Sequence, residues 1–297
     1  MAILADQNTR VIIQGITGRE AATFTKDMLD YGTRVVAGVT PGKHGQQVHG
    51  IPVYDTVRQA LKAHAADASV ISVPPALVKG AVMEALDNGI KLLVVVSERV
   101  PRKDTIEFLE VAHEKNARVI GPNTLGFITP HRLKLGMAGG PLEDVKKAYR
   151  PGPVGIASRS GGMTTEIANL LTTQGIGQST CVGVGGDPVV GSNFLDLIPL
   201  FNRDPETAAV VLFCEPGGVI EEKLAEFVRA ENLSLPIIAF IAGRFVDDMP
   251  GVRFGHAATI VDGDRGTTKG KIEVFQKAGI RVAASFSDIV PLVKEVL

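Results

Sequence analysis

The chain has 297 residues, which is enough for two domains of ordinary size. Apolar residues make up 45% and charged residues 21%, a globular balance that excludes a disordered chain. The 31 basic and 32 acidic side chains give a net charge of −1, so no basic surface for a nucleic acid is expected. No apolar run reaches the ~20 residues that span a bilayer, and the first residues lack a signal-peptide pattern. We expect a soluble, cytoplasmic protein that binds neither nucleic acid nor membrane.

Cysteine and metal-ligand patterns are sparse. Cys181 and Cys214 lie inside apolar runs, which predicts buried free thiols in a reducing compartment. The sequence contains no His-Glu-x-x-His, Cys-x-x-Cys or Walker A pattern. We therefore expect no metal site on this chain.

Short apolar runs alternate with amphipathic stretches over the first 120 residues. The runs predict strands at 10–14, 34–39, 68–73, 91–96 and 118–120. The amphipathic stretches predict helices at 20–31, 56–64, 77–88 and 103–115. Runs such as 91–96 (KLLVVV) are apolar on both faces, as a parallel sheet covered by helices requires. This alternation predicts a doubly wound α/β domain.

The alternation breaks and then restarts. Segments rich in glycine and proline between 121 and 152 predict an irregular crossing segment over 127–150. The second half predicts strands at 153–158, 178–184, 208–214, 236–241 and near 281–283. It predicts helices at 162–173, 192–202, 219–231, 267–278 and 286–296. The fold class is therefore α/β, with doubly wound domains at 1–126 and 151–297.

Glycines follow the first predicted strand. Gly15, Gly18 and Ala21 form a Gly-x-x-Gly-x-x-Ala pattern before a helix, where backbone N–H groups can approach a phosphate. The pattern suits a nucleotide-like ligand without specifying NAD, and the alternative is a tight turn with no ligand. Lys43, on the loop after the next strand, is placed to pair with a phosphate or else is a solvated loop lysine.

Three successive strands of the second domain also end in glycine-rich loops. Ser160, Gly161 and Gly162 open a helix, which predicts either an anion site or a simple serine N-cap. The next strand runs into Gly185, Gly186 and Asp187, and the third into Glu215-Pro-Gly-Gly. Loops at the carboxyl ends of parallel strands are where open α/β sheets bind ligands.

His256 stands between a glycine and an alanine, so no bulky neighbour in sequence blocks its approach by a large group. Such a histidine is compatible with nucleophilic chemistry. An incidental loop histidine fits the spacing equally well.

Taken together, these segments resemble the alpha subunit of succinyl-CoA synthetase (succinate–CoA ligase). The most specific segments are 14–18 (QGITG), 38–43 (GVTPGK), 121–123 (GPN), 158–161 (SRSG), 177–188 (GQSTCVGVGGDP) and 255–257 (GHA). The resemblance implies a Rossmann-like CoA-binding domain followed by a flavodoxin-like ligase domain. It also implies a heterodimer or heterotetramer with a beta subunit of ATP-grasp fold, which binds ATP or GTP with Mg²⁺.

The resemblance further implies roles for individual residues. His256 matches the histidine that is phosphorylated in the family, and Glu215 matches the glutamate that contacts it. The positions that match the CoA site are Thr17, Gly18, Arg19, Glu20, Lys43, Val96, Ser97 and Glu98. The phosphate and acid site is matched by Ser160, Gly161, Gly162 and Thr165.

Thr165 departs from the family pattern, which has tyrosine there, and Gly162-Met163 replaces Thr-Leu. These forms are similar to citryl-CoA synthetase and ATP-citrate lyase, so a small carboxylic acid bulkier than succinate, such as malate or citrate, is an alternative to succinate. The expected activity is an ADP- or GDP-forming acid–CoA ligase. The alternatives are a non-enzymatic CoA- or nucleotide-binding module and an NAD-dependent oxidoreductase, although the latter lacks the third glycine and the ribose-binding acid.

Overall fold

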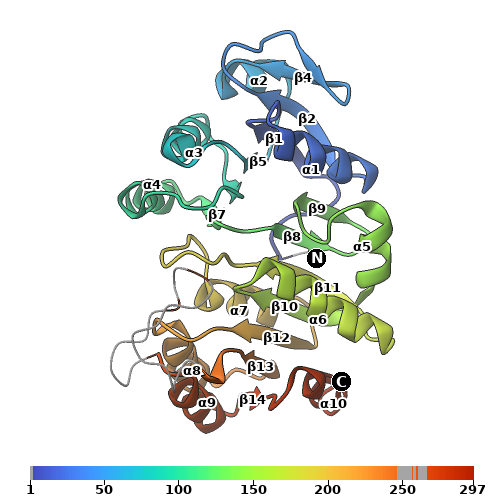
Figure 1. Ribbon diagram of the computed structural model, residues 1–297, viewed down its shortest axis with the longest axis vertical. Coiled ribbons are helices and arrows are strands. Elements are labelled where there is room, and N and C mark those ends of the chain that lie inside the picture. The colour runs from blue at the N-terminus through green and yellow to red at the C-terminus, as the bar shows by residue number, and fades with distance from the viewer. Residues whose placement is uncertain (1–2, 246–255, 257–258, 260–265) are drawn as a thin grey trace.

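The computed structural model describes residues 3–245, 256, 259 and 266–297. In this part of the chain, two seven-stranded sheets follow one another along the long axis of the molecule, each flanked by helices (Figure 1). The first sheet belongs to the N-terminal half and the second to the C-terminal half.

The N-terminal sheet has the strand order β3-β4-β2-β1-β5-β6-β7. All of these strands except β3 run parallel to one another. Its strands are β1 (Arg10–Gln14), β2 (Arg34–Val39), β3 (Gln47–Val48), β4 (Ile51–Tyr54), β5 (Ala68–Ile71), β6 (Leu92–Val95) and β7 (Arg118–Ile120). Its helices are α1 (Arg19–Asp30), α2 (Val57–Ala63), α3 (Val78–Asp87) and α4 (Arg102–Glu114), with a 3₁₀ turn at Pro75–Leu77. The order reverses between β1 and β5, as it does in a Rossmann fold, and ligands bind at such a switch point.

The C-terminal sheet has the order β14-β13-β12-β10-β11-β8-β9. Its strands are β8 (Gly126–Thr129), β9 (Leu133–Gly136), β10 (Pro151–Ser158), β11 (Gln178–Gly183), β12 (Ala209–Cys214), β13 (Ile237–Ile241) and β14 (Arg281–Val282). Its helices are α5 (Leu142–Ala148), α6 (Gly161–Thr173), α7 (Phe194–Arg203), α8 (Ile220–Glu231), α9 (Thr268–Lys277) and α10 (Ile289–Lys294), with a 3₁₀ turn at Phe286–Asp288. The five parallel strands have flavodoxin-like order, with the switch point between β10 and β12. The predicted fold class is confirmed.

One prediction about the chain's organisation is wrong. The segment 127–150 is not irregular, because it contains most of the β8–β9 hairpin and all of α5. The hairpin pairs antiparallel with β11 through Cys181 and Val182. Strands of four residues flanked by glycines are too short to show the alternation of apolar and polar residues that predicts a strand. These two are stabilised by a partner strand some 50 residues further along the chain. The β3–β4 hairpin was also missed, because strands of two and four residues are too short to show a periodic pattern.

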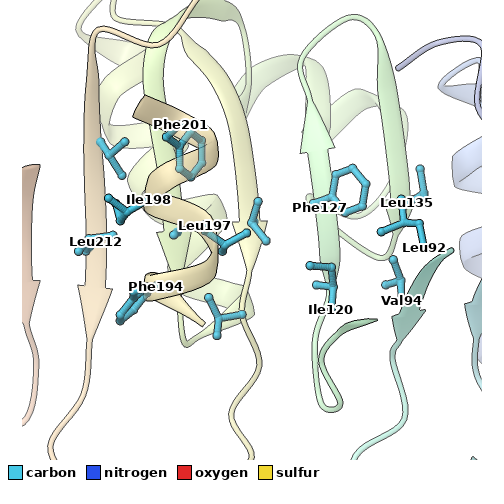
Figure 2. Close-up of a cluster of buried hydrophobic side chains, with 14 of the residues drawn as sticks. Leu92, Val94, Ile120, Phe127, Leu135, Phe194, Leu197, Ile198, Phe201 and Leu212 are labelled. Atoms are coloured by element: carbon cyan, nitrogen blue, oxygen red, sulfur yellow. The ribbon is translucent and has the colours of Figure 1, made fainter. Parts of the chain in front are cut away.

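A continuous apolar cluster joins the two halves (Figure 2). The hairpin contributes Phe127 and Leu135, which are fully buried. On one side of the hairpin the cluster includes residues of the N-terminal strands β6 and β7, namely Leu92, Val94 and Ile120. On the other side it includes residues of α7 and β12, namely Phe194, Leu197, Ile198, Phe201 and Leu212. Because buried side chains of both sheets belong to one cluster, the loops at the two sheet edges are held in a defined relation to each other.

Both cysteines are free and buried, as the sequence predicts. Burial raises the pKa of each thiol. Among the described residues, no helix combines the length and the apolar character that crossing a membrane demands.

Phe201 provides a test of this core. Its ring lies against β10, where a Cβ added at Gly155 would come within 2.6 Å of it. Phe201→Ala leaves a cavity and is expected to lower the free energy of unfolding by about 3–5 kcal/mol in urea denaturation. Ile106→Ala, at a side chain that is 54% exposed, is the control and should change the free energy of unfolding by no more than about 0.5 kcal/mol. Equal effects of the two substitutions would contradict this assignment of the core.

Candidate active site

A histidine–carboxylate pair lies at the carboxyl edge of the C-terminal sheet. Nδ1 of His256 is 2.9 Å from each carboxylate oxygen of Glu215, which directly follows β12. The Glu215 side chain is 12% exposed and that of His256 33%. An ionised carboxylate only accepts, so Nδ1–H donates and the lone pair of the neutral ring remains on Nε2.

The surroundings of His256 raise the pKa of its imidazole. The largest cause is the hydrogen bond to Glu215, and the charges of Glu215 and Asp187 act in the same direction. Partial burial and the charge of Arg159 oppose the increase. Arg159 follows β10, and its guanidinium donates to the backbone oxygen of Asp187 at 3.2 Å. The ring therefore lies between charges carried by three successive strand ends.

The ring of His256 packs directly on Gly186. A Cβ at this position would lie 2.5 Å from Cδ2 and 2.8 Å from Nε2 of the histidine, closer than any carbon contact allows. Gly186 is fixed in turn by its N–H, which donates to the backbone oxygen of Asn123 at 3.1 Å. Glycine is required here by the close approach of the ring.

Asn123 connects the two sheet edges. Its N–H donates to the oxygen of Ser97, after β6, at 2.9 Å. Its side-chain amide donates to Oδ1 of Asp187, after β11, at 2.9 Å. Asn123 has φ +57°, a left-handed conformation that asparagine tolerates better than most residues. A single residue thus ties the N-terminal loop 96–98 to the loop beneath His256.

The N-terminus of α6 contributes a further part of the site. The hydroxyl of Ser160 caps the helix by accepting from the N–H of Met163 at 3.4 Å. A Cβ at Gly161 would approach Leu125 to 2.3 Å, whereas one at Gly162 would meet nothing within 4 Å. The N-terminus of this 13-residue helix favours an anion because its amide dipoles are aligned. The N-cap and anion-site interpretations of the sequence are therefore compatible.

Four neighbouring cavities form a trough between the sheet edges. Their volumes are about 430, 390, 350 and 450 Å³ in order from the N-terminal switch point to His256. Shared lining residues connect them: Gly18 links the first two, Ser97 and Glu98 the next two, and Asn123 and His256 the last two. Such a trough suits an elongated ligand with one end at Thr40 and the other at His256.

Most of the predicted site residues line this trough. Thr17 and Gly18 line its first cavity, and Arg19 and Glu20 the second. One cavity brings together the two sets that the sequence placed in different domains, namely Glu20, Val96, Ser97, Glu98, Ser160, Gly161, Gly162 and His256.

Three predicted residues line none of the four cavities: Glu215 contacts His256 instead, and two others lie elsewhere. Lys43 is exposed on the loop after β2 and lines none of the four cavities, while its N–H donates to Oδ1 of Asp55 at 3.1 Å. Thr165 does not line them either, and its hydroxyl lies 2.9 Å from the hydroxyl of the buried Tyr149. The Thr165 side chain is thus turned toward Tyr149 at the end of α5. The expectation that it forms the wall of an acid pocket is not supported by this position.

Asn123 and Gly186 received no role from the sequence, and Arg159 appeared only as part of a motif. The available signals were the Gly-Pro-Asn triplet and the doubled glycine after β11. In the described part of the chain, no group of three or more His, Cys, Asp or Glu side chains is arranged to hold a metal ion.

The fold and the site together define a CoA-binding protein in which a Rossmann-like half meets a flavodoxin-like half at a carboxylate-bound histidine. Residues 6–99 match the model of the CoA binding domain and residues 157–281 that of the CoA-ligase domain. A succinate–CoA ligase [ADP-forming] alpha subunit of Archaeoglobus fulgidus is 47% identical over 297 residues, covering 100% of this chain and 99% of the relative. The chain belongs to the family of succinate–CoA ligase alpha subunits.

Two further proteins are similar over the whole chain. A subunit of an ADP-forming sulfoacetate–CoA ligase from Bilophila wadsworthia is 44% identical, covering 100% of both chains. The structure of ATP citrate lyase from Methanothrix soehngenii, in complex with citrate and coenzyme A, aligns with a TM-score of 0.92 at 28% identity. That alignment covers 100% of this chain and 51% of the longer lyase chain.

Gly186→Ala tests the contact beneath the histidine. The added methyl group is expected to displace the His256 ring from the Glu215 carboxylate, which lowers the pKa of the imidazole toward its ordinary value. NMR titration of the histidine resonances measures this shift. Coenzyme A binding, measured on the same sample, should be unchanged and reports that the fold is intact. An unaltered titration of His256 would show that the ring does not depend on this contact.

Proposed function

We propose that the chain is the alpha subunit of an ADP- or GDP-forming acid–CoA ligase. Together with a beta subunit it would convert a carboxylic acid, CoA and ATP or GTP into acyl-CoA, nucleoside diphosphate and phosphate. The observation that carries the proposal is the His256–Glu215 hydrogen bond at the end of the trough. The names of the full-length relatives support the same reaction class.

His256 would carry the phosphoryl group between two substrates. Its Nε2 attacks the terminal phosphorus of the nucleoside triphosphate, so that an N–P bond forms, a P–O bond breaks and the diphosphate leaves. A carboxylate oxygen of the acid then attacks the same phosphorus, which restores the imidazole and gives an acyl phosphate. The CoA thiolate displaces phosphate from the acyl carbon and forms the thioester.

Glu215 would set the tautomer and stabilise the charge on the ring. With the Nδ1–H bound to this carboxylate, only Nε2 carries a lone pair, and the phosphorylated ring keeps its Nδ1 proton. The N-terminus of α6 and the guanidinium of Arg159 supply positive potential for the phosphoryl oxygens. Ser160, Gly161 and Gly162 belong to this part of the proposed site.

Coenzyme A binding follows from the family, and its placement in the trough is part of the proposal. The first cavity is lined by apolar side chains such as Val39, Val73 and Leu77, which suit the flat base of a nucleotide. The N-terminus of α1 at Gly18, with the Thr17 hydroxyl and the Arg19 guanidinium, suits phosphates, and Glu20 would contribute only its backbone N–H. The backbone of Val96, Ser97 and Glu98 lies along the path that leads toward His256. When bound, CoA supplies the thiol that accepts the acyl group.

The domain division at 1–126 and 151–297, with 127–150 between them, remains part of the proposal. So does the beta subunit, for which we propose an ATP-grasp fold that binds the nucleotide and Mg²⁺, in a heterodimer or heterotetramer. The two buried thiols agree with the cytoplasmic location we propose.

The acid is a small carboxylate, with succinate as the first candidate. Relatives of nearly equal identity are named for succinate and for sulfoacetate, so a panel should contain both, together with malate and citrate. The position of Thr165 beside Tyr149 gives no reason to favour a bulkier acid. A non-enzymatic CoA-binding module would leave the histidine–carboxylate pair without a task.

Glu215→Gln tests the role of the carboxylate. Because the carboxylate raises the pKa of His256, its removal lowers that pKa. The phosphoryl acceptor is the neutral ring, so the rate of labelling rises with pH through the pKa of His256. The acid limb of this profile should therefore move to lower pH in the variant, while the plateau falls roughly 10²-fold as orientation is lost. Labelling with terminally labelled ATP in the presence of the beta subunit measures both effects.

His256→Asn is the companion variant and should not be labelled at any pH. Acid-labile, base-stable label that persists in this variant would refute the phosphohistidine assignment. A profile unchanged by Glu215→Gln would remove the carboxylate from the mechanism.

Lys43→Ala tests whether the exposed loop after β2 reaches CoA. If its ammonium pairs with a phosphate of the ligand, calorimetry should show a loss on the order of 1–3 kcal/mol in CoA binding. Lys62→Ala on the exposed side of α2 removes the same charge from the same half of the chain and should have no effect. Equal affinities of the two variants would leave Lys43 outside the CoA site.

A further inference from the structure

A buried ion pair lies behind the histidine–carboxylate pair. Lys271 of α9 and Glu221 of α8 are 0% and 1% exposed, and Nζ lies 2.6 Å from Oε2 of the glutamate. Lysine is among the residues least often buried, since its ammonium loses hydration on leaving water. The contacts of Lys271 should therefore show why a lysine is buried at this position.

The lysine binds the loop that carries Glu215. Its Nζ donates to the backbone oxygen of Glu215 at 2.9 Å and to that of Gly217 at 2.6 Å. With Glu221 as the third acceptor, all three ammonium hydrogens are used. Two carbonyls of the Glu215-Pro-Gly-Gly loop, two positions apart, are thus held by one side chain from another element.

Stability alone is a poor explanation for the pair. Apolar residues of similar volume often replace a buried ion pair with no loss of stability. The second oxygen of Glu221, Oε1, is buried and has no hydrogen-bond partner in the described part of the chain. The contacts that distinguish this pair are those to the two loop carbonyls.

We propose that Lys271 is a positioning residue for the phosphoryl-accepting histidine, acting through the backbone of the Glu215 loop. The inference rests on the proposed function of His256. Lys271 holds the main chain of Glu215 and leaves both carboxylate oxygens of that residue to Nδ1 of the histidine. Displacements of about 1 Å in a reacting geometry can cost on the order of 10²-fold in rate.

Glu98, Arg99 and Arg102 line a cavity together with His256, while the charged groups that shift its pKa come from three strand ends. They are Glu215 after β12, Asp187 after β11 and Arg159 after β10. Lys271 donates its hydrogen bonds within the described residues to the main chain of Glu215 and Gly217 and to Glu221, and none of them to His256. Its removal is therefore expected to act on the histidine by releasing the carboxylate, which lowers the pKa of the imidazole.

The test uses NMR titration of His256 in the full chain, which needs neither nucleotide nor beta subunit. Lys271→Met combined with Glu221→Leu replaces the pair by apolar side chains and removes the donors to the loop. We expect the titration midpoint of His256 to fall, as it does in Glu215→Gln. Adding Glu215→Gln to the paired variant should lower the midpoint no further, because the lysine acts through that carboxylate.

Lys277→Met is the matched control, because it removes an exposed lysine from the same helix and should leave the midpoint unchanged. A midpoint unchanged in the paired variant, or shifts that add to those of Glu215→Gln, would overturn the inference. Failure of the paired variant to fold, with lost CoA binding, would assign the pair to stability and would also overturn it.

Labelling with ATP in the presence of the beta subunit separates this inference from the proposed function. The paired variant should be phosphorylated roughly ten- to a hundredfold more slowly than the wild type. If the wild-type chain is not labelled while the titration midpoints shift as expected, the proposed function fails and the coupling of Lys271 to His256 stands. If the wild type is labelled and the paired variant is labelled equally fast, the positioning role fails.

Discussion

The hydrogen bond between Nδ1 of His256 and the carboxylate of Glu215 is the interaction on which the site depends. It fixes the ring orientation and leaves Nε2 as the basic nitrogen. A carboxylate only 12% exposed acts strongly on its partner because little water screens it. Both partners of this bond are in contact with further residues. Gly186 has no side chain, so the histidine ring can pack directly on its backbone, and Lys271 donates a hydrogen bond to the main chain of the glutamate.

The arrangement of the two sheets explains why this bond lies at the end of a trough. Each sheet has a switch point where its strand order reverses, and loops next to these points line the connected cavities. The β8–β9 hairpin hydrogen-bonds to the second sheet while its side chains share a core with the first. Asn123 adds polar bonds to both edges. Connected cavities therefore run from the switch point of the first sheet to His256.

Thr165, the residue that the sequence associates with choice of the acid, contacts another residue of its own half of the chain. The hydroxyl of Thr165 binds Tyr149 in the contact between α5 and α6, where it stabilises helix packing. Relatives with 44% and 47% identity carry the names of different acids, although their chains align over essentially the same length. Family membership thus fixes the class of reaction more firmly than it fixes the substrate.

The sequence by itself determined the class of the fold, the family and several of the residues that line the trough. Buried parallel strands such as Leu92–Val95 are apolar throughout, and glycine-rich loops follow β1, β11 and β12, so both signals are local. Only the tertiary structure decided the rest. The hairpin strands gain their stability from a distant partner, Glu215 meets His256 across 41 positions, and Lys271 lies on an amphipathic helix where a lysine predicts exposure. The roles of such residues depend on contacts between elements that are distant in sequence. The local periodicity of the sequence does not predict those contacts.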